Sequence, residues 1–171
     1  MANDREWIVA AARRYERPLL AYVRRLLGDP HRGRDVVQDA FLQLCKQSRA
    51  EVEPRLAPWL FAVCRRRVVD ILRKENRMAS LSADPPATAN GPPDVLEHKD
   101  TTAAVLARLS RLPANQQEAV RLKFLQQFSY REIAEVMGLS ESHVGVLLHL
   151  ALKSLRQSFA DPLKTAGGTR P

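Results

Sequence analysis

The residues best suited to chemistry lie in one basic stretch, WLFAVCRRRVVDILRKENR, which begins at Trp59. Charged side chains recur in it at i, i+4, i+7 and i+11, namely Arg66, Asp70, Arg73 and Arg77, with Arg65 and Lys74 beside them. A helix would place them on one face, next to an apolar stripe. Guanidinium groups neutralise phosphates and an exposed indole can stack on an unpaired base, so this face suits single-stranded nucleic acid. The alternative is a solvated helix face with a buried Trp.

A second pattern, at residues 129–156, predicts a helix-turn-helix. Ser129 and Glu132 are typical of a helix start, Gly138 ends that helix, and Ser140 can cap the next one. In such a motif the first helix braces the second, whose N-terminal part can enter the major groove of DNA. Helix pairs without a DNA role share this spacing, so the pattern alone leaves both interpretations open.

The sequence offers no catalytic or metal-binding constellation. It has no Gly-rich phosphate loop, no HExxH and no nucleophile elbow. Its four histidines, His31, His98, His143 and His149, are scattered, and Cys45 and Cys64 lack metal-ligand spacing. We therefore expect buried free thiols, no metal, no cofactor and no enzyme activity.

The elements that carry these residues read as helices in two blocks, 5–77 and 101–159. In the first block, an apolar stripe from Tyr15 to Leu27 ends at Gly28-Asp29-Pro30, a second helix follows, and a loop at 49–58 precedes the basic segment. In the second block, Pro113 opens a helix to about Leu125. Four prolines make 78–100 a flexible linker, and 160–171 a disordered tail. The predicted fold is all-α, with two small helical domains.

Charge also indicates a polyanionic partner. The 171 residues carry a net charge of +8, and the pI is about 10.1. Lys and Arg outnumber Asp and Glu by 17 to 10 in residues 1–77 and by 9 to 5 in 101–171, whereas the linker is acidic, with 1 against 4. Since no run approaches the ~20 apolar residues of a membrane span, we expect a cytoplasmic protein without membrane insertion.

Three motifs, taken together and in this order, resemble a known family. GRDVVQDAFLQL resembles the polymerase-binding helix of bacterial sigma factors, and WLFAVCRRRVVDILRKENR resembles the helix after their promoter-melting loop. LPANQQEAVRLKFLQQFSYREIAEVMGLSESHVGVLLHLALKSLR resembles their C-terminal helix-turn-helix. The chain is most similar to the extracytoplasmic-function (ECF) group of the sigma-70 family, which keeps only the second and fourth family regions.

This resemblance implies a protein that binds core RNA polymerase and melts promoter DNA, with an anti-sigma factor as a further partner. The residues it implies for polymerase binding are Asp35, Val36, Gln38, Asp39, Leu42 and Gln43. Those implied for the minus-10 element are Arg55, Trp59, Arg65, Arg66, Arg73 and Lys74. Those implied for the minus-35 element are Ser129, Tyr130, Arg131, Ser140, Ser142, His143, Gly145, Val146, His149 and Lys153.

The last helix departs from the family. It reads HVGVLLHLALK, so Gly145, Val146, Leu147, Leu150 and Leu152 occupy positions that are often charged or polar in relatives. Fewer base and phosphate contacts predict weak minus-35 recognition. An apolar helix could instead meet a protein, such as a polymerase flap, an activator or an anti-sigma factor, or its leucines could pack internally. Arg66 and Arg67 also depart from the family and leave the sequence preference open.

Two other functions compete with the sigma-factor interpretation. An ordinary helix-turn-helix regulator would carry a sensor or dimerisation domain at its N-terminus, and it would need no polymerase-docking helix. A sigma-like accessory protein would bind polymerase or an anti-sigma factor without supporting initiation. GRDVVQDAFLQL argues against the first of these, whereas the apolar last helix keeps the second open.

Overall fold

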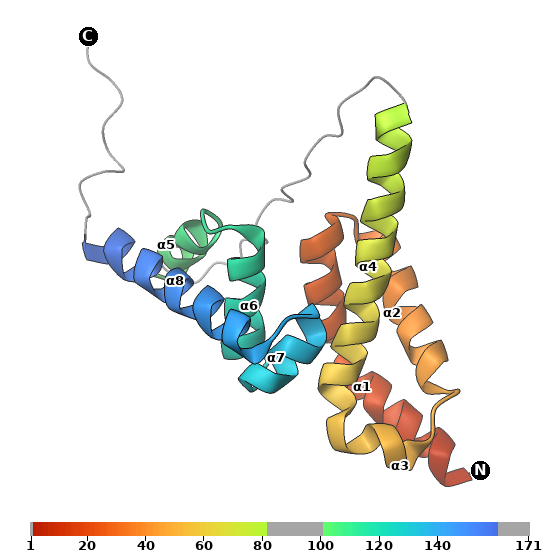
Figure 1. The fold of residues 1–171 in the computed structure, drawn as a ribbon. Coiled ribbons are helices and arrows are strands. Elements are labelled where there is room, and N and C mark those ends of the chain that lie inside the picture. Colours follow the sequence, from red (N-terminus) through yellow and green to blue (C-terminus); the bar gives the residue numbers. More distant parts are fainter. Residues whose placement is uncertain (1, 82–100, 161–171) are drawn as a thin grey trace. The chain divides into compact units, whose positions relative to one another are not determined.

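The computed structural model describes residues 2–81 and 101–160, which form helices joined by short connections and contain no β-strand. The chain divides into two compact units, built mainly from α1–α4 and from α5–α8 (Figure 1). This confirms the all-α prediction. Within the described residues, no helix is long and apolar enough to cross a membrane.

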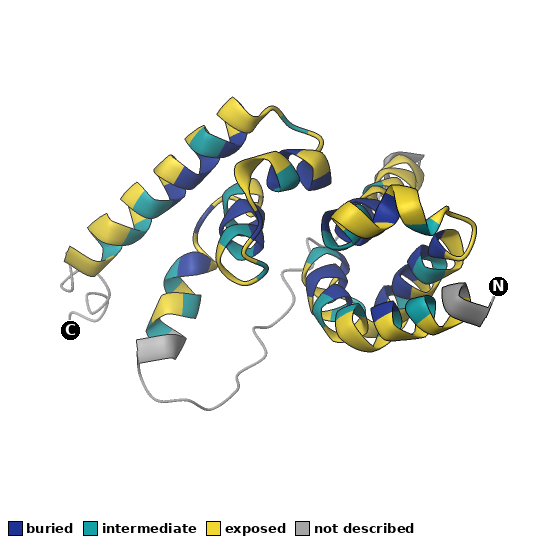
Figure 2. Cartoon of the chain, turned by 90° about the horizontal axis from the view of Figure 1, so that it is seen from below, coloured by how far each residue is buried: buried dark blue, intermediate teal, exposed yellow. Residues whose placement is uncertain are grey.

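The first unit is a bundle of three long helices with a short helical connection. Its elements are α1 (Ala2–Leu27), α2 (Pro30–Leu44), α3 (Arg49–Val52), the 3-10 turn η1 (Glu53–Arg55) and α4 (Leu56–Leu81). Helices α1, α2 and α4 pack pairwise against one another. The side chains between them are aliphatic and fully buried, among them Leu19, Val23, Val36, Leu44, Leu60 and Val68 (Figure 2). Each stabilises the bundle by about 1.5–3 kcal/mol through removal from water.

The turn between α1 and α2 is fixed by local chemistry. Gly28 takes a left-handed conformation with φ of 73°, which ends α1. Asp29 then caps α2, because its Oδ1 accepts hydrogen bonds from the backbone N–H of His31 at 2.8 Å and of Arg32 at 3.4 Å. Pro30 occupies the first helical position, where a missing N–H costs nothing. The predicted stop at Gly28-Asp29-Pro30 is confirmed.

Two ion pairs tie α2 to α4 across the surface of this unit. Nε of Arg67 lies 3.4 Å from Oδ2 of Asp39, and Arg32 pairs with Glu75. All four side chains are partly exposed, so each pair contributes at most about 1 kcal/mol. Asp39 therefore has a structural contact as well as any role in binding.

The second unit consists of four shorter helices. They are α5 (Thr101–Leu109), α6 (Ala114–Phe124), α7 (Tyr130–Met137) and α8 (Glu141–Ala160). Helix α8 packs against α5 and α6. The buried apolar side chains include Ala119, Leu122, Ile133, Val144, Leu148 and Ala151. Helices α7 and α8 form the predicted helix-turn-helix.

The caps of α7 and α8 follow the sequence prediction closely. Ser129 Oγ accepts a hydrogen bond from the Glu132 backbone N–H at 3.2 Å, and Glu132 Oε2 accepts one from the Ser129 N–H at 2.7 Å. This reciprocal capping box starts α7. Gly138, with φ of 67°, ends it, and Ser140 Oγ accepts from the His143 N–H at 3.2 Å at the start of α8.

Two predictions in the first block are wrong. The segment 49–58, predicted as a loop, is helical almost throughout, because Pro54 and Pro58 occupy early positions of η1 and α4, where proline fits a helical turn. Cys45 was expected to be buried but is exposed. It lies just beyond the end of α2, and Leu44 fills the core position instead.

The predicted boundaries differ from the helix ends by a few residues. Helix α1 begins at Ala2 and passes through Pro18, and α4 continues to Leu81, four residues into the predicted linker. The rest of that linker, 82–100, and residues 161–171 of the predicted tail lie outside the described residues.

Candidate nucleic-acid and polymerase interfaces

Helix α4 carries Trp59 and the predicted arginines on one side. Trp59, Arg66, Asp70, Arg73 and Arg77 are separated by 7, 4, 3 and 4 residues, which returns each to nearly the same direction at 3.6 residues per turn. Trp59 is half-buried, whereas the other four are exposed. An indole ring at one end of a basic strip can stack its face on a base, while the arginines contact the backbone that follows.

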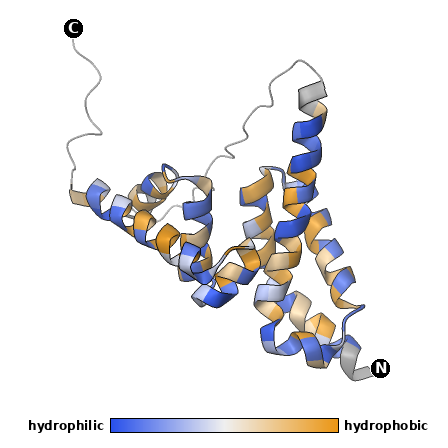
Figure 3. Cartoon of the chain, in the orientation of Figure 1, coloured by the Kyte–Doolittle hydropathy of each residue, from blue (hydrophilic) through white to orange (hydrophobic). Residues whose placement is uncertain are grey.

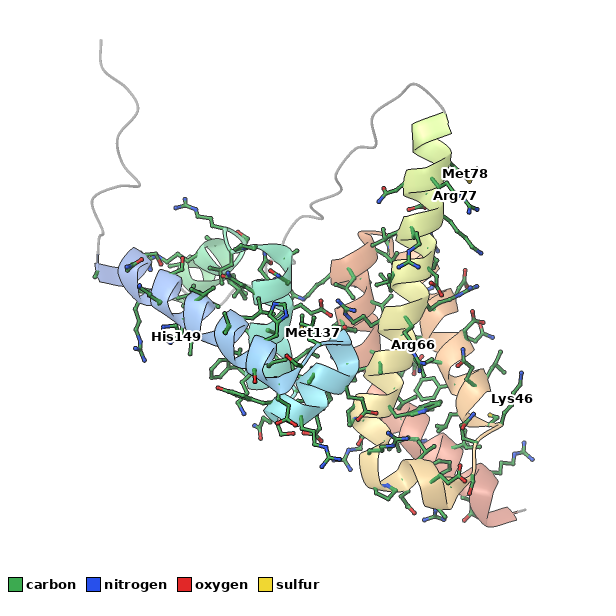
Figure 4. All side chains as sticks on the ribbon, viewed as in Figure 1. Lys46, Arg66, Arg77, Met78, Met137 and His149 are labelled. Carbon is green, nitrogen blue, oxygen red and sulfur yellow. The ribbon has the colours of Figure 1, made fainter. Side chains whose placement is uncertain are left out.

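The last turns of α4 extend beyond α1 and α2 (Figure 1). From Leu72 to Met78 every residue is exposed, and this end of the helix is strongly hydrophilic (Figure 3). Arg66 lies in the middle of the helix and Arg77 near its end (Figure 4). A shallow groove on this surface is lined by Arg67, Asp70, Arg73, Lys74 and Arg77. Four cations around one carboxylate leave a surplus of positive charge for phosphates.

The remaining minus-10 candidates lie in different surroundings. Arg55 is exposed on η1, whereas Arg65 is only partly exposed and points away from the basic strip on the helical wheel. Arg77, which the sequence analysis placed on the basic face, and Arg67, which it did not, both line the groove. The spacing of Arg67 to Asp70 and Lys74 is the sequence signal that could have found it.

Helix α2 presents an acid and amide face with an exposed leucine near its C-terminal end. Asp35, Gln38 and Leu42 follow at i, i+3 and i+7, so they share one side, with Asp39 next to them. Leu42 is 54% exposed, so this face offers an apolar side chain beside its acid and amide groups. Gln43 is exposed at the edge of this face. Val36 is 2% exposed and belongs to the core, so it supports the face from below and offers no contact of its own.

Helices α7 and α8 bring most of the predicted minus-35 residues to the surface. Ser142, Val146, His149 and Lys153 are exposed and recur at i, i+4, i+7 and i+11 along α8. His149 projects from the middle of that helix (Figure 4). Arg131 and His143 are exposed as well.

The other members of the predicted set have structural tasks. Ser129 and Ser140 cap α7 and α8 through their hydroxyl groups. The Tyr130 ring, 44% exposed, lies 5.3 Å from the Lys123 ammonium and covers Gly145, where an added Cβ would lie 3.7 Å from Tyr130 Cε2. These residues position α8, whichever contacts its exposed face makes.

The apolar residues of α8 divide between core and surface. Leu147 is 4% exposed, whereas Val146 and Leu150 are 54% and 44% exposed. The expectation of internal packing thus holds for Leu147 alone among these three. The surface that could face DNA is therefore short of charge, with Lys153 as its one lysine or arginine between Ser142 and Lys153.

The two thiols of the first unit differ in exposure, because Cys45 lies on the surface and Cys64 lies in the core. Burial raises the pKa of the Cys64 thiol to about 12, so it stays protonated at neutral pH. Arg49 pairs with Glu53 and lowers the pKa of that exposed carboxyl. No cluster of three or more metal-ligating side chains occurs among the described residues.

Comparison with known proteins agrees with the geometry. The family "Sigma-70 region 2" matches residues 11–78, and "Sigma-70, region 4" matches residues 102–155. The ECF RNA polymerase sigma factor SigM of Bacillus subtilis is 26% identical over 133 residues, covering 75% of this chain and 80% of that protein. SigL of Mycobacterium tuberculosis is 28% identical over 143 residues, covering 81% and 80%.

A solved structure shares the fold. The sigma factor RpoE of Bartonella quintana, crystallised with the anti-sigma factor NepR, superimposes with a TM-score of 0.68 at 18% identity, covering 94% of this chain and 98% of that one. Fold and motifs together define an all-α, two-unit transcription protein. The chain belongs to the sigma-70 family as an ECF sigma factor, which directs promoter-specific initiation by RNA polymerase.

Proposed function

We propose that this sigma factor uses three separate surfaces, on α2, α4 and α8, to join polymerase to a promoter. The observation that carries the proposal is the single side of α4 on which Trp59, Arg66, Arg73 and Arg77 follow one another. This side would hold the minus-10 element as a single strand. Arg55, at the approach to α4, Lys74, beside the strip, and the partly exposed Arg65 complete the set.

Melting then needs binding energy and no catalytic residue. Unstacking a base costs a few kcal/mol, and stacking on an aromatic ring returns about 1–3 kcal/mol per base. Arginine contacts with phosphates, which release counterions, supply the rest. The protein would thus act in the cytoplasm as a binding factor, while polymerase performs phosphoryl transfer.

The α2 face would dock onto the coiled-coil clamp of polymerase. Support comes from its composition, because exposed acid and amide side chains lead along the helix to one exposed leucine, so the face combines polar and apolar contacts. Asp35, Gln38, Leu42 and Gln43 would make the contacts. The Asp39 carboxylate would contact polymerase while it keeps its ion pair with Arg67.

The α8 face would read the minus-35 element, with weak affinity. Ser142, His149 and Lys153 could contact bases or phosphates, and Val146 could meet a thymine methyl group. Its low charge leaves α4 with the larger share of the electrostatic attraction. An anti-sigma factor would hold the protein inactive, as NepR accompanies RpoE in the related structure.

The test is transcription from a pooled promoter library with core polymerase and the purified chain. We expect new start sites with the wild type, and their loss both in Asp35→Ala/Gln38→Ala and in Arg66→Ala/Arg73→Ala. Glu16→Ala and Lys46→Ala/Arg111→Ala remove exposed charge outside these faces and should initiate normally. Initiation that survives loss of the α4 arginines would disprove the proposed minus-10 surface.

A second candidate is an accessory protein that binds polymerase without supporting initiation. The exposed Val146 and Leu150 on α8 favour it, because a helix with this surface could meet a protein better than DNA. Polymerase binding without any new start site would select this alternative.

A further inference from the structure

A second basic surface lies on α1, away from the motifs that indicated the function. The helix contains six arginines and no lysine. Arg13 and Arg17 form one column along its outer side, Arg14 and Arg25 form a second, and the exposed Ala10 and Ala21 lie between the two columns. We call the four arginines the α1 arginine face.

The positive charge of the α1 arginine face is not neutralised within the described part of the chain. All four side chains are exposed, and Arg13, Arg17 and Arg25 form no ion pair with a described residue. Arg14 lies over the neighbouring Tyr15 ring at 5.3 Å, a contact that leaves its charge in place. Between Ala10 and Leu27 the one acidic residue is Glu16, and it lies beside the Arg13 column.

The shape and composition of this surface fit a phosphate backbone. From Arg13 to Arg25 the helix rises about 18 Å, which corresponds to roughly five phosphates along one DNA strand. One guanidinium group can donate hydrogen bonds to two oxygens of the same phosphate. The small side chains of Ala10 and Ala21 allow the DNA backbone to approach the helix closely. A membrane surface would require large apolar side chains next to the cations, but Val9 is the one exposed large apolar residue of α1.

We propose that the α1 arginine face is a second nucleic-acid contact, which binds the phosphates of promoter DNA without reading its sequence. The inference rests on the proposed function, since that function brings DNA to the same helical unit. The α4 strip would hold the melted strand, and α1 would hold a neighbouring stretch of backbone. Two such contacts on one unit would help keep the DNA bent or opened.

The first experiment uses the full chain without polymerase, so it does not depend on initiation. Fluorescence anisotropy measures binding to a labelled 30-base-pair duplex of arbitrary sequence between 50 and 300 mM KCl. The slope of log K against log salt is negative, and Arg13→Ala/Arg17→Ala should make it shallower by about 1.8, because each lost phosphate contact accounts for about 0.9. At 0.1 M salt this corresponds to roughly 60-fold weaker binding.

Two variants separate charge from folding. Arg13→Lys/Arg17→Lys keeps the charge and should retain the wild-type slope. Lys46→Ala/Arg111→Ala removes the same net charge elsewhere and should change the slope by much less than the α1 variant. Equal slopes in the α1 and control variants, or no duplex binding by the wild type at 50 mM KCl, would overturn the proposal.

A second experiment identifies the neighbour of α1 in the polymerase complex. A photo-crosslinking amino acid replaces Ala21, which lies between the arginine columns, and the holoenzyme is irradiated on a labelled promoter fragment. A crosslink to DNA supports the inference, and a crosslink only to a polymerase subunit overturns it. A holoenzyme that does not initiate while the α1 slope change persists would disprove the proposed function and leave the α1 contact standing.

Discussion

Two glycines of the helix-turn-helix should respond in opposite ways to the same substitution. Gly138 ends α7 with φ of 67°, a conformation that costs an alanine roughly 1–2 kcal/mol, and no atom lies within 4 Å of its would-be Cβ. Gly145 lies inside α8, where alanine is favoured by about 1 kcal/mol. A Cβ there would meet Tyr130 Cε2 at 3.7 Å, an ordinary van der Waals distance. We expect Gly138→Ala to destabilise the second unit by about 1 kcal/mol and Gly145→Ala to stabilise it by up to as much.

The two variants should therefore differ by about 2 kcal/mol, or roughly 25-fold in the equilibrium between folded and unfolded forms. Tryptophan fluorescence cannot report it, because Trp7 and Trp59 both lie in the first unit. Native-state hydrogen exchange of the slowest amides in α6 and α8 measures the change directly. Protection factors that shift in the same direction in both variants would refute the assignment of backbone conformation at these positions.

Three further predictions follow from the first unit and the α7 cap. Asp35→Ala should weaken polymerase binding with an unchanged melting temperature, whereas Asp39→Ala should also lose up to about 1 kcal/mol of stability with its Arg67 pair; equal melting temperatures in the two variants would contradict the structural role of Asp39. At pH 8, iodoacetamide should label Cys45 and spare Cys64, and rapid labelling of both thiols would show that Cys64 is not buried. Because burial raises the Cys64 pKa from 9.0 to about 12, the free energy of unfolding should fall by roughly 1.4 kcal/mol per pH unit above about pH 9. The Cys64→Ala variant should lack this decline. Ser129→Ala should cost about 1 kcal/mol by hydrogen exchange of α7, and Ser129→Thr, which keeps the hydroxyl, should cost much less.

Local signals in the sequence predicted the helix boundaries well where a cap defines them. The side chains of Asp29, Ser129 and Ser140 accept hydrogen bonds from backbone N–H groups two or three residues further on, and Gly138 ends α7. These effects are local, so they can be predicted from the spacing of the residues alone. The helix-turn-helix was predictable for this reason. The α4 strip was predictable as well, since Arg66, Arg73 and Arg77 repeat with the helix period.

Prolines and tertiary contacts account for what the sequence analysis missed. The apolar stripe from Tyr15 to Leu27 already predicted a helix through Pro18, and the buried Leu19 and Val23 on the following turn stabilise it there, but the start of α1 at Ala2 was not predicted. The segment that contains Pro54 was read as a loop, although Pro54 fits an early helical position of η1. The Arg67–Asp39 pair joins residues 28 positions apart, and no local pattern indicates it. No local pattern indicates the exposure of Cys45 either, because it follows from Leu44 occupying the core position at the end of α2.

The most direct test of the central claim is potassium permanganate footprinting of a promoter taken from the pooled library, with core polymerase and either the wild-type chain or Arg66→Ala/Arg73→Ala. Our account predicts reactive, unpaired thymines at the minus-10 element with the wild type and their loss in the variant, while polymerase binding stays intact. Equal thymine reactivity with both proteins would contradict it, because the strand would then be held open without the α4 surface.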